Sequence, residues 1–287
     1  MKTDTQATCV IDGAHIETQL GRVYRGAPLV EWASVTKTVT AATMLLVLQE
    51  ARVDERTPVS ELAPHLLIAG TFSVGDLIDH TSGLPRVHPG MSSGLVGDPY
   101  ARADRATVFE CLKTDAAPGG RPREYSNLGY ALLGEIIETM TGTSWFDACT
   151  ERVLAPAGVT TATIDPDPGD RVVLTGWRGK VREPWSISRT PYAAAGGLWS
   201  TVDDLARHGA SARSTNPGLR GWEHRDGLVW HSGQTRDSGA CLVVTRAGAI
   251  AAHTLGRLPH AADKIAVSLL GTGTGTDTGT GAGVGRS

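Results

Sequence analysis

The sequence predicts an α+β fold: an antiparallel sheet flanked by helices and built from both termini, with an inserted, mainly helical lobe. Strand-like alternation occurs near both ends, within 8–33 and 228–255. A long, mostly apolar helix is expected over 34–51, and further helical patterns fill much of 60–154. The expected organisation is a sheet lobe of 1–58 and 195–270, a helical lobe of 59–194, and a disordered Gly/Thr tail at 271–287.

After two short strands within 8–33, the first half of the chain contains helices delimited by residues that start or stop them. Thr71 or Ser73 provides an N-terminal cap, and Gly142 provides a C-terminal stop. Prolines interrupt or end several of the other patterns. The helices are expected, in order, over 34–51, 60–67, 71–80, 105–113, 128–140 and 144–154.

The last third of the chain returns to strands. Residues 160–198 mix short apolar runs with Pro, Gly and Arg, and are expected to form irregular strand and loop. A short helix then opens at Ser200 and Thr201, where the first-turn carboxylates of Asp203 and Asp204 suit the positive end of the helix dipole. Three strands and a final helix follow, at 228–231, 240–245, 249–255 and 261–270.

Composition argues against several classes of function. The 287 residues carry a net charge of −3 with scattered basic residues, so nucleic acid is not an expected partner. No polybasic stretch indicates a membrane surface, and the apolar runs are too short to span a bilayer. The first residues lack an apolar export segment, so we expect a cytoplasmic protein. The four cysteines, Cys9, Cys111, Cys149 and Cys241, lie far apart in the sequence, so we expect free thiols. No metal or other cofactor is expected.

Ser34 and Lys37 form a Ser-x-x-Lys motif at the start of the apolar helix. Helical geometry brings the hydroxyl and the amine onto one face, one turn apart. A lysine desolvated in a cleft can accept the serine proton, and an unpaired N–H of the first turn can stabilise an oxyanion. The alternative is an N-cap serine beside a solvated lysine. The catalytic interpretation is favoured because the chain has few lysines and the helix looks buried.

Two more motifs lie where a cleft built around Ser34 needs them. Tyr125-Ser126-Asn127 follows a Pro/Gly turn and precedes a helix, so its side chains can project from a loop. His231-Ser232-Gly233 lies on an expected edge strand, where the glycine allows close approach of a ligand. Together the three motifs resemble those of serine β-lactamases and penicillin-binding proteins. The similarity is greatest to the group of class C β-lactamases, D-alanyl-D-alanine carboxypeptidases, and related esterases and transacylases.

Connecting segments resemble the same family. Residues 80–85 read HTSGLP, 125–138 continue the second motif into a helix, and 195–205 read AGGLWSTVDDL. These segments occur in the family's order and, with the motifs, cover most of 32–209 and about 230–245. Their joint occurrence favours the family's fold and a serine acyl-enzyme.

The resemblance implies a role for each matched residue. Ser34 is the implied nucleophile, and Lys37 is its base or the group that tunes it. Tyr125 is the group that passes a proton to the leaving group and later activates the acceptor. A phenol suits this role if cationic Lys37 favours the phenolate. The substrate-binding residues implied are Asn127, which orients the scissile acyl group, His231 and Gly233 of the third motif, and Gln234, whose backbone N–H joins that of Ser34 in the oxyanion hole.

Ordinary structural roles are the alternatives for several residues. Tyr125 can be a half-buried core tyrosine, and Asn127 can cap the helix that follows it. His80 is expected to be a hydrogen-bonded structural histidine. Glu31 and Glu124 are expected to be solvated or paired, and Trp177 or Trp185 is a candidate pocket wall.

Three departures from the family pattern shape the functional prediction. His231 replaces the lysine of the β-lactamases and is mostly neutral at physiological pH, although Arg236 is a candidate substitute for the charge. The stretch between the 203–208 helix and His231 is short, which predicts a cleft open on one side. The expected cytoplasmic location favours a small metabolite over the cell wall.

We therefore predict a serine acyl-enzyme that transfers an acyl group from a small-molecule ester or amide to water, an amine or an alcohol. A biosynthetic transacylase of secondary metabolism, or an esterase or amidase, is the favoured form. A D-alanyl-D-alanine carboxypeptidase or β-lactamase is the alternative, and a non-catalytic binding protein of the same fold is the rival from another class.

Overall fold

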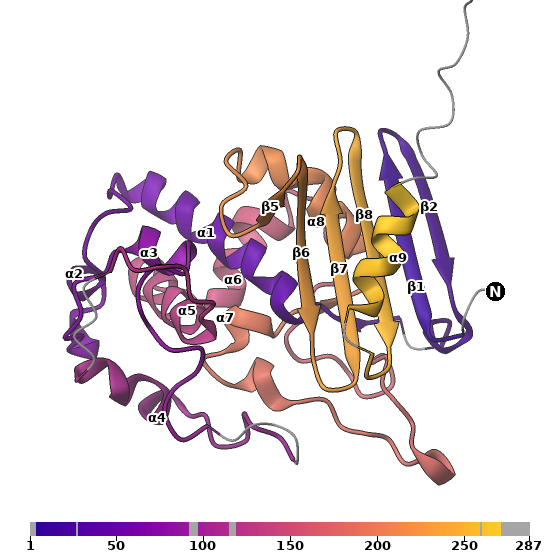
Figure 1. Cartoon of the computed structure of the whole chain (residues 1–287), viewed down its shortest axis with the longest axis horizontal. Coiled ribbons are helices and arrows are strands. Elements are labelled where there is room, and N and C mark those ends of the chain that lie inside the picture. The colour runs from indigo at the N-terminus through magenta and orange to yellow at the C-terminus, as the bar shows by residue number, and fades with distance from the viewer. Residues whose placement is uncertain (1–3, 27, 92–96, 115–118, 259, 271–287) are drawn as a thin grey trace, which may run out of the picture.

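The computed structural model describes residues 4–26, 28–91, 97–114, 119–258 and 260–270, and these have the expected α+β fold. Six antiparallel strands form one sheet in the spatial order β2-β1-β8-β7-β6-β5 (Figure 1). The two ends of the chain meet where β1 pairs with β8, with Gln6 opposite Thr254. The strands of this sheet are β1 (Gln6–Asp12), β2 (His15–Leu20), β5 (Glu223–Arg225), β6 (Leu228–Gln234), β7 (Ser238–Val244) and β8 (Gly248–Leu255).

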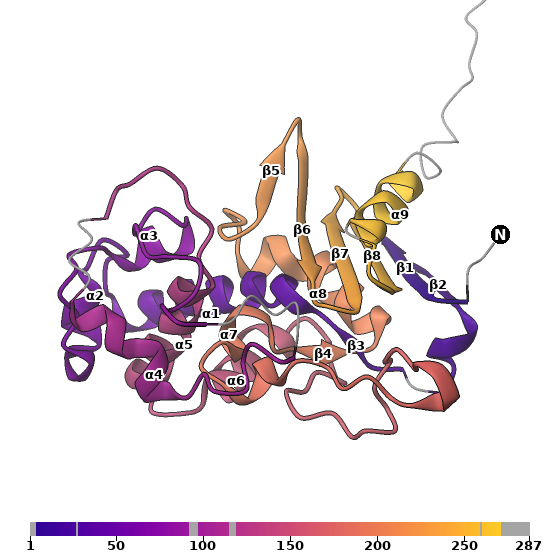
Figure 2. The same cartoon turned by 60° about the horizontal axis from the view of Figure 1, so that its bottom comes forward.

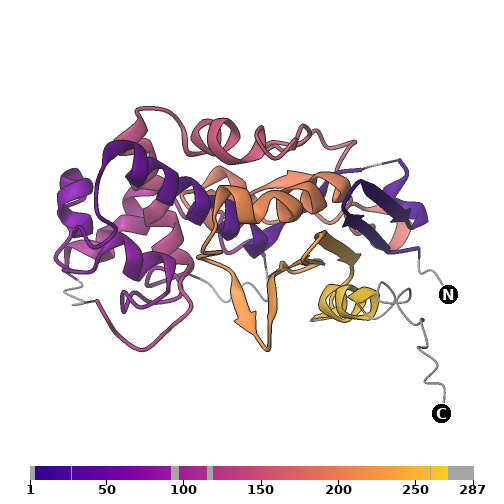
Figure 3. The same ribbon diagram turned by 90° about the horizontal axis from the view of Figure 1, so that it is seen from above.

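Helices cover both faces of the sheet. α8 (Val202–Thr215) packs on one face and α9 (Ala261–Leu270) on the other, as the view from above shows (Figure 3). Strands β7 and β8 are therefore buried along their whole length, and their residues do not alternate between polar and apolar. Gly209 permits the close approach of α8, because a Cβ there would lie 2.7 Å from Cδ1 of Leu242.

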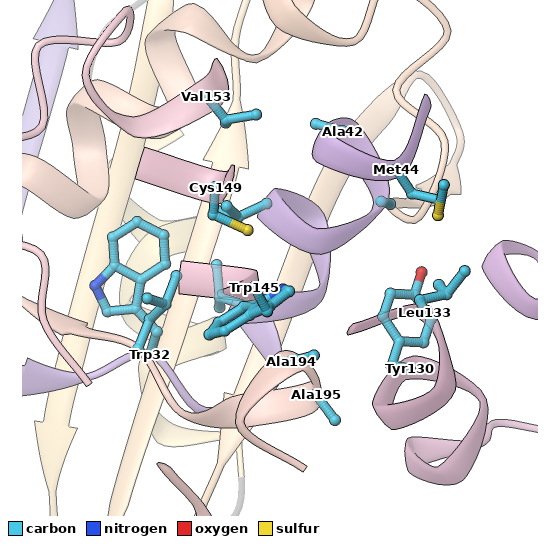
Figure 4. Packing of buried hydrophobic residues seen from close by; sticks show 14 of the residues in the cluster. Trp32, Ala42, Met44, Tyr130, Leu133, Trp145, Cys149, Val153, Ala194 and Ala195 are labelled. Carbon is cyan, nitrogen blue, oxygen red and sulfur yellow. The ribbon is translucent and has the colours of Figure 1, made fainter. Parts of the chain in front are cut away.

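The helical lobe is organised around α1 (Thr36–Ala51) and α5 (Asn127–Thr141), which pack against each other beside the sheet (Figure 2). Trp145 and Ala194 lie close together in this core (Figure 4), and Thr40 connects them: its hydroxyl donates to the Ala194 carbonyl at 2.7 Å and accepts from Trp145 Nε1 at 3.1 Å. The remaining helices are α2 (Val59–Leu62), α3 (Val74–Ile78), α4 (Arg105–Phe109), α6 (Trp145–Cys149) and α7 (Ala193–Gly196).

A second sheet of two short strands, β3 (Val30–Glu31) and β4 (Trp199–Ser200), was not expected from the sequence. The segment after β3 is fixed to the one that contains β4, since Trp32 Nε1 donates to the Ser200 hydroxyl at 2.8 Å. This anchor holds the chain immediately before Ser34. The expected helix over 34–51 accordingly begins with a 3-10 turn, Ala33–Val35, and α1 follows from Thr36. The expected tail at 271–287 lies outside the described residues.

Candidate active site

Ser34 lies in the 3-10 turn at the junction of the two lobes. Its neighbour Ala33 has a positive φ of 46°, a strained conformation for a residue with a side chain. Strand β6 approaches this turn closely, because a Cβ on Gly233 would lie 2.3 Å from the Trp32 carbonyl oxygen and 2.9 Å from the Ser34 nitrogen. The glycine of the third motif therefore allows β6 to contact the backbone of the nucleophile. β6 is not the expected edge strand, because β5 pairs with its first residues.

Lys37 places its amine beside the Ser34 hydroxyl. Nζ lies 3.1 Å from Ser34 Oγ and donates to the Ala195 carbonyl at 2.6 Å. The side chain is completely buried, and this burial, together with the nearby positive charge of Arg86, holds the pKa of Lys37 well below 10.5. A neutral amine can donate to Ala195 and still accept the serine proton on its lone pair. The solvated lysine weighed as an alternative is therefore wrong.

Tyr125 faces the same amine: Lys37 Nζ lies 4.8 Å from the centre of the Tyr125 ring, and the Arg86 guanidinium lies 5.2 Å from it. Burial raises the pKa of Tyr125 to about 12, although a hydrogen bond with Ser34 and the charge of Arg86 oppose the rise. Burial thus opposes both the phenolate and the cationic lysine on which the sequence-based expectation depends, and it favours the neutral form of each group.

His80 holds the Tyr125 loop in place, as expected of a structural histidine. Its ring packs against those of Tyr125 and Tyr130, with centroid distances of 4.5 and 5.1 Å. Nδ1 accepts the backbone N–H of Ser126 at 3.1 Å, and the His80 carbonyl accepts that of Glu124 at 2.8 Å. Burial lowers the pKa of His80 to about 3, so the neutral ring keeps Nδ1 free to accept this bond.

Asn127 is the first residue of α5, but it does not cap the helix. Ser126 is the cap, because its hydroxyl accepts the Gly129 N–H at 2.9 Å. The Asn127 N–H donates to the Arg86 carbonyl at 2.8 Å, while its buried Oδ1 has no partner among the described residues. A buried amide oxygen without a partner is costly, so this atom is suited to accept a hydrogen bond from a ligand.

His231 lies buried on β6, and its Nδ1 donates to the Ser232 carbonyl at 3.0 Å. The carbonyl can only accept, so Nε2 of the neutral ring is an acceptor. Burial, with the nearby Lys37, lowers the pKa of His231 to about 3, which excludes a fixed positive charge at the third motif. Gln234 ends β6, and its side chain donates to the carbonyls of Thr235 and Ser238 at 3.0 and 2.7 Å.

Two cavities meet at Ser34 and share Arg86 and Gln234 as lining residues. The smaller chamber, of about 260 Å³, is also lined by Tyr125, His231, Gly233, Glu223, His260 and Asp263. The larger chamber, of about 450 Å³, is also lined by Asn127, Val87, Tyr100, Trp185, Ile187 and Ala195. The structure thus brings together all seven residues selected from the sequence, and Ser34 lines both cavities.

Three charged residues differ from the sequence-based expectations. Arg86 was not selected from the sequence, but it borders both chambers. Its position directly after the HTSGLP segment was the sequence signal that could have identified it. Arg236 is not among the residues lining either chamber; its guanidinium pairs with Asp237 and donates to the Glu183 carbonyl. Glu31 is neither solvated nor ion-paired: it is buried and accepts hydrogen bonds from Thr235 and Ser238.

Of the two candidate tryptophans, Trp185 lines the larger chamber, and the side chain of Trp177 lies outside the described part of the structure. The described residues contain no group of three or more His, Cys, Asp or Glu arranged to hold a metal ion. Within the same residues, every helix is too short or too polar to cross a membrane.

Comparison with known proteins places this geometry among serine enzymes. The family model described as Beta-lactamase matches residues 7–279. The D-alanyl-D-alanine-carboxypeptidase/endopeptidase AmpH of Escherichia coli is 29% identical over 221 residues, which cover 70% of this chain and 55% of AmpH. The chain spans about half the length of the curated relatives it matches, or less.

Solved structures share the fold at lower identity. A beta-lactamase/D-alanine carboxypeptidase from Yersinia pestis, in complex with citrate, superimposes with a TM-score of 0.76 and 18% identity, covering 93% of this chain and 91% of that one. A D-amino acid amidase from Ochrobactrum anthropi, in complex with D-phenylalanine, has a TM-score of 0.68 and 21% identity, covering 87% and 86%.

Proposed function

Since this chain belongs to the beta-lactamase family of serine hydrolases, we propose that Ser34 takes an acyl group from a small-molecule ester or amide and passes it to water, an amine or an alcohol. One observation carries the proposal: the Ser34 hydroxyl lies 3.1 Å from the buried Lys37 amine, whose pKa is held well below its ordinary value. An uncharged amine at this distance can activate a serine at neutral pH.

Acylation follows from these groups. The Ser34 oxygen attacks the acyl carbon while Lys37 takes its proton, and the Ser34–carbon bond forms. The N–H groups of Ser34 and Gln234 are proposed to stabilise the oxyanion, because β6 lies against the turn that carries the serine. Tyr125 then gives its proton to the leaving group as the bond between acyl carbon and leaving group breaks. The protonated lysine returns a proton to the phenolate, so both groups end as they began.

The second half of the reaction reverses these roles. Water, an amine or an alcohol enters the smaller chamber and gives its proton to Tyr125 or Lys37 as it attacks the acyl-enzyme. His231 Nε2 is the acceptor available to orient the N–H or O–H of that molecule. A chamber of about 260 Å³ can hold an acceptor larger than water, which supports acyl transfer beside hydrolysis.

Cleavage of a D-alanyl peptide is the second candidate, because AmpH is named as a carboxypeptidase. In this chain His231 supplies no positive charge for a substrate carboxylate, and Arg86 is the cation that borders both chambers. This difference makes an ester or amide without a peptide carboxylate the preferred donor class.

Intact-protein mass spectrometry after incubation with a fluorophosphonate or a 4-nitrophenyl ester tests the proposal. We expect a single covalent adduct that is absent from Ser34→Ala and much slower to form in Lys37→Met. Failure of the correctly folded wild-type protein to form an adduct with either reagent would instead identify a binding protein. Addition of candidate amines, alcohols, penicillins and D-alanyl peptides then separates transfer, β-lactamase and carboxypeptidase activity by the products.

A further inference from the structure

The position of Tyr125 distinguishes the two chambers in the proposed reaction. The group that protonates the leaving group must face it, and Tyr125 lines only the smaller chamber. The leaving group is therefore assigned to the smaller chamber, and the acyl group to the other chamber that Ser34 lines. We call the larger chamber, lined by Asn127, Val87, Tyr100, Trp185 and Ile187, the acyl chamber.

Aromatic and aliphatic side chains form a large part of the lining of the acyl chamber. The rings of Tyr100 and Trp185 lie 5.9 Å apart between centroids, and Val87 and Ile187 also border the space. A volume of about 450 Å³ is in the range of pockets that bind bulky small molecules. Such a surface gains free energy by burying apolar atoms of the acyl group.

Tyr100 and Trp185 form an aromatic wall of the acyl chamber, and hydrogen bonds hold the segments that carry these two residues in place. The Asp98 carboxylate accepts from both the backbone N–H and the hydroxyl of Ser186, at 2.8 and 2.6 Å, and from the Tyr100 N–H at 2.9 Å. One carboxylate therefore joins the segments that carry Tyr100 and Trp185. The Tyr100 ring also packs edge-on against Tyr192, with 5.5 Å between centroids. A wall fixed in advance loses little entropy when a ligand binds.

Charge restricts the acyl group further. Arg86 is the single charged residue among the described residues that line this chamber, and no described carboxylate forms an ion pair with it. No acidic side chain among them is available to balance an ammonium group. A positively charged acyl group would lose its hydration and meet a guanidinium of the same sign.

We propose, on the basis of the function proposed above, that the acyl chamber selects a bulky apolar, preferably aromatic, acyl group that carries no positive charge. Trp185 provides the apolar surface that determines this specificity, and Arg86 excludes an ammonium group near the acyl carbon. Acyl groups of the α-amino acid type are thus poor donors unless their amine is blocked.

Three 4-nitrophenyl esters with the same leaving group test the proposal: the acetate, the 3-phenylpropionate, and the ester of D-phenylalanine. The last two differ only by an α-ammonium group. The test is made at about pH 6.5, where this amine is protonated. We expect kcat/KM for the phenylpropionate to be at least ten times that for the acetate and at least ten times that for the D-phenylalanine ester.

Variants connect each preference to its residue. Trp185→Ala should lower the phenylpropionate-to-acetate ratio at least fivefold, and Trp185→Phe should restore most of it. Arg86→Gln should lower the discrimination against the D-phenylalanine ester at least fivefold, whereas Arg189→Gln, a change at an exposed arginine paired with Asp165, should leave it unchanged. Each ratio compares two substrates on one preparation, so it does not depend on the fraction of folded protein.

The outcomes separate this inference from the proposed function. Equal kcat/KM values for the acetate and the phenylpropionate, or a higher kcat/KM for the D-phenylalanine ester, would overturn the assigned specificity. The proposed acyl-enzyme would still be supported in that case if an acetyl adduct formed on Ser34. No adduct from any of the three esters would instead overturn the proposed function. Unchanged ratios in both Trp185→Ala and Arg86→Gln would show that the acyl group does not occupy this chamber.

Discussion

The Glu31 carboxylate accepts a hydrogen bond from the Ser238 hydroxyl at 2.6 Å, although the two residues are 207 positions apart in the sequence. Glu31 also accepts from the Thr235 hydroxyl at 2.9 Å. It therefore connects the strand that leads to Ser34 with the turn that follows Gln234. The two N–H groups proposed for the oxyanion hole come from these same two segments, so Glu31 is a positioning residue for that hole.

We expect Glu31→Ala to lower kcat for a 4-nitrophenyl ester by about 10–100-fold with a smaller change in KM, because the oxyanion forms only as the reaction proceeds. Burial raises the pKa of Glu31 and favours its neutral form, which Gln imitates. Glu31→Gln should accordingly keep kcat within a few-fold of wild type. Steady-state kinetics beside circular dichroism make the comparison, and equal losses in the two variants would refute the positioning role.

Gly233→Ala should separate β6 from the turn that carries Ser34. The added Cβ would meet the Trp32 carbonyl oxygen at 2.3 Å and the Ser34 nitrogen at 2.9 Å, and backbone atoms cannot move aside easily. We expect at least a hundredfold loss of kcat/KM and a destabilisation of about 1–3 kcal/mol in urea unfolding. Gly26→Ala is the matched control, because a Cβ there meets nothing within 4 Å. Wild-type activity in Gly233→Ala would contradict the proposed contact.

The sequence was sufficient to predict the α+β fold, because Ser34, Tyr125 and His231 each occur in a motif with a recognisable neighbourhood. The helix at 261–270 coincides with α9, and Gly142 ends α5 with a positive φ of 69°. Local patterns of apolar residues and caps determine such elements, so they can be read before any tertiary contact is known.

Features that depend on distant contacts were missed. The two-residue strands β3 and β4 are too short to produce a pattern, and they form because distant parts of the chain hold them together. Strand β5 was missed for another reason: it pairs with β6 in a local hairpin whose Asp226-Gly227 turn is a signal that the sequence analysis did not use. Glu31 was expected to be solvated or paired, and its burial against two hydroxyl groups could not be predicted because those partners lie more than 200 residues away. That burial opposes a Tyr125 phenolate could not be predicted either, because burial of the phenol and of Lys37 is a property of the folded cleft.

Lys37→Met should be inactive and yet more stable than the wild type at neutral pH. Between the lowered pKa of folded Lys37 and its ordinary value of 10.5, the unfolded chain binds one more proton, so the free energy of unfolding rises with pH. Burying a lysine whose pKa is lowered therefore costs free energy of unfolding at neutral pH, and methionine removes this penalty. The substitution also leaves the Ala195 carbonyl without its donor, at a cost of about 1–3 kcal/mol. We expect the removal of this penalty to outweigh that cost, so the variant should be the more stable protein at pH 7.

Urea unfolding of both proteins at pH 7 and near pH 10 measures this difference, which should decrease as the pH rises. Lys113→Met is a control at an exposed lysine paired with Glu110, and it should change stability by less than about 0.5 kcal/mol. A variant less stable than wild type by the same amount at both pH values would show that Lys37 is charged in the folded protein.

Tyr125→Phe should show a dependence on the leaving group that Ser34→Ala does not share. A 4-nitrophenolate departs readily as an anion, whereas an alkoxide or an amine must be protonated as its bond breaks. Burial raises the pKa of Tyr125 to about 12, so the phenol keeps its proton until the leaving group requires it. We expect the variant to lose about 100–1000-fold in kcat/KM for an ethyl ester or an amide, and tenfold or less for the matching 4-nitrophenyl ester.

Ser34→Ala is the matched comparison for this experiment, because removal of the nucleophile should abolish turnover of all three substrates alike. His80→Ala, which removes the ring that supports the Tyr125 loop, should show the same dependence on the leaving group in weaker form. Equal losses for the ethyl and 4-nitrophenyl esters in Tyr125→Phe would mean that the phenol does not protonate the leaving group. The leaving group was assigned to the smaller chamber because Tyr125 lines it, so that assignment would then be unsupported as well.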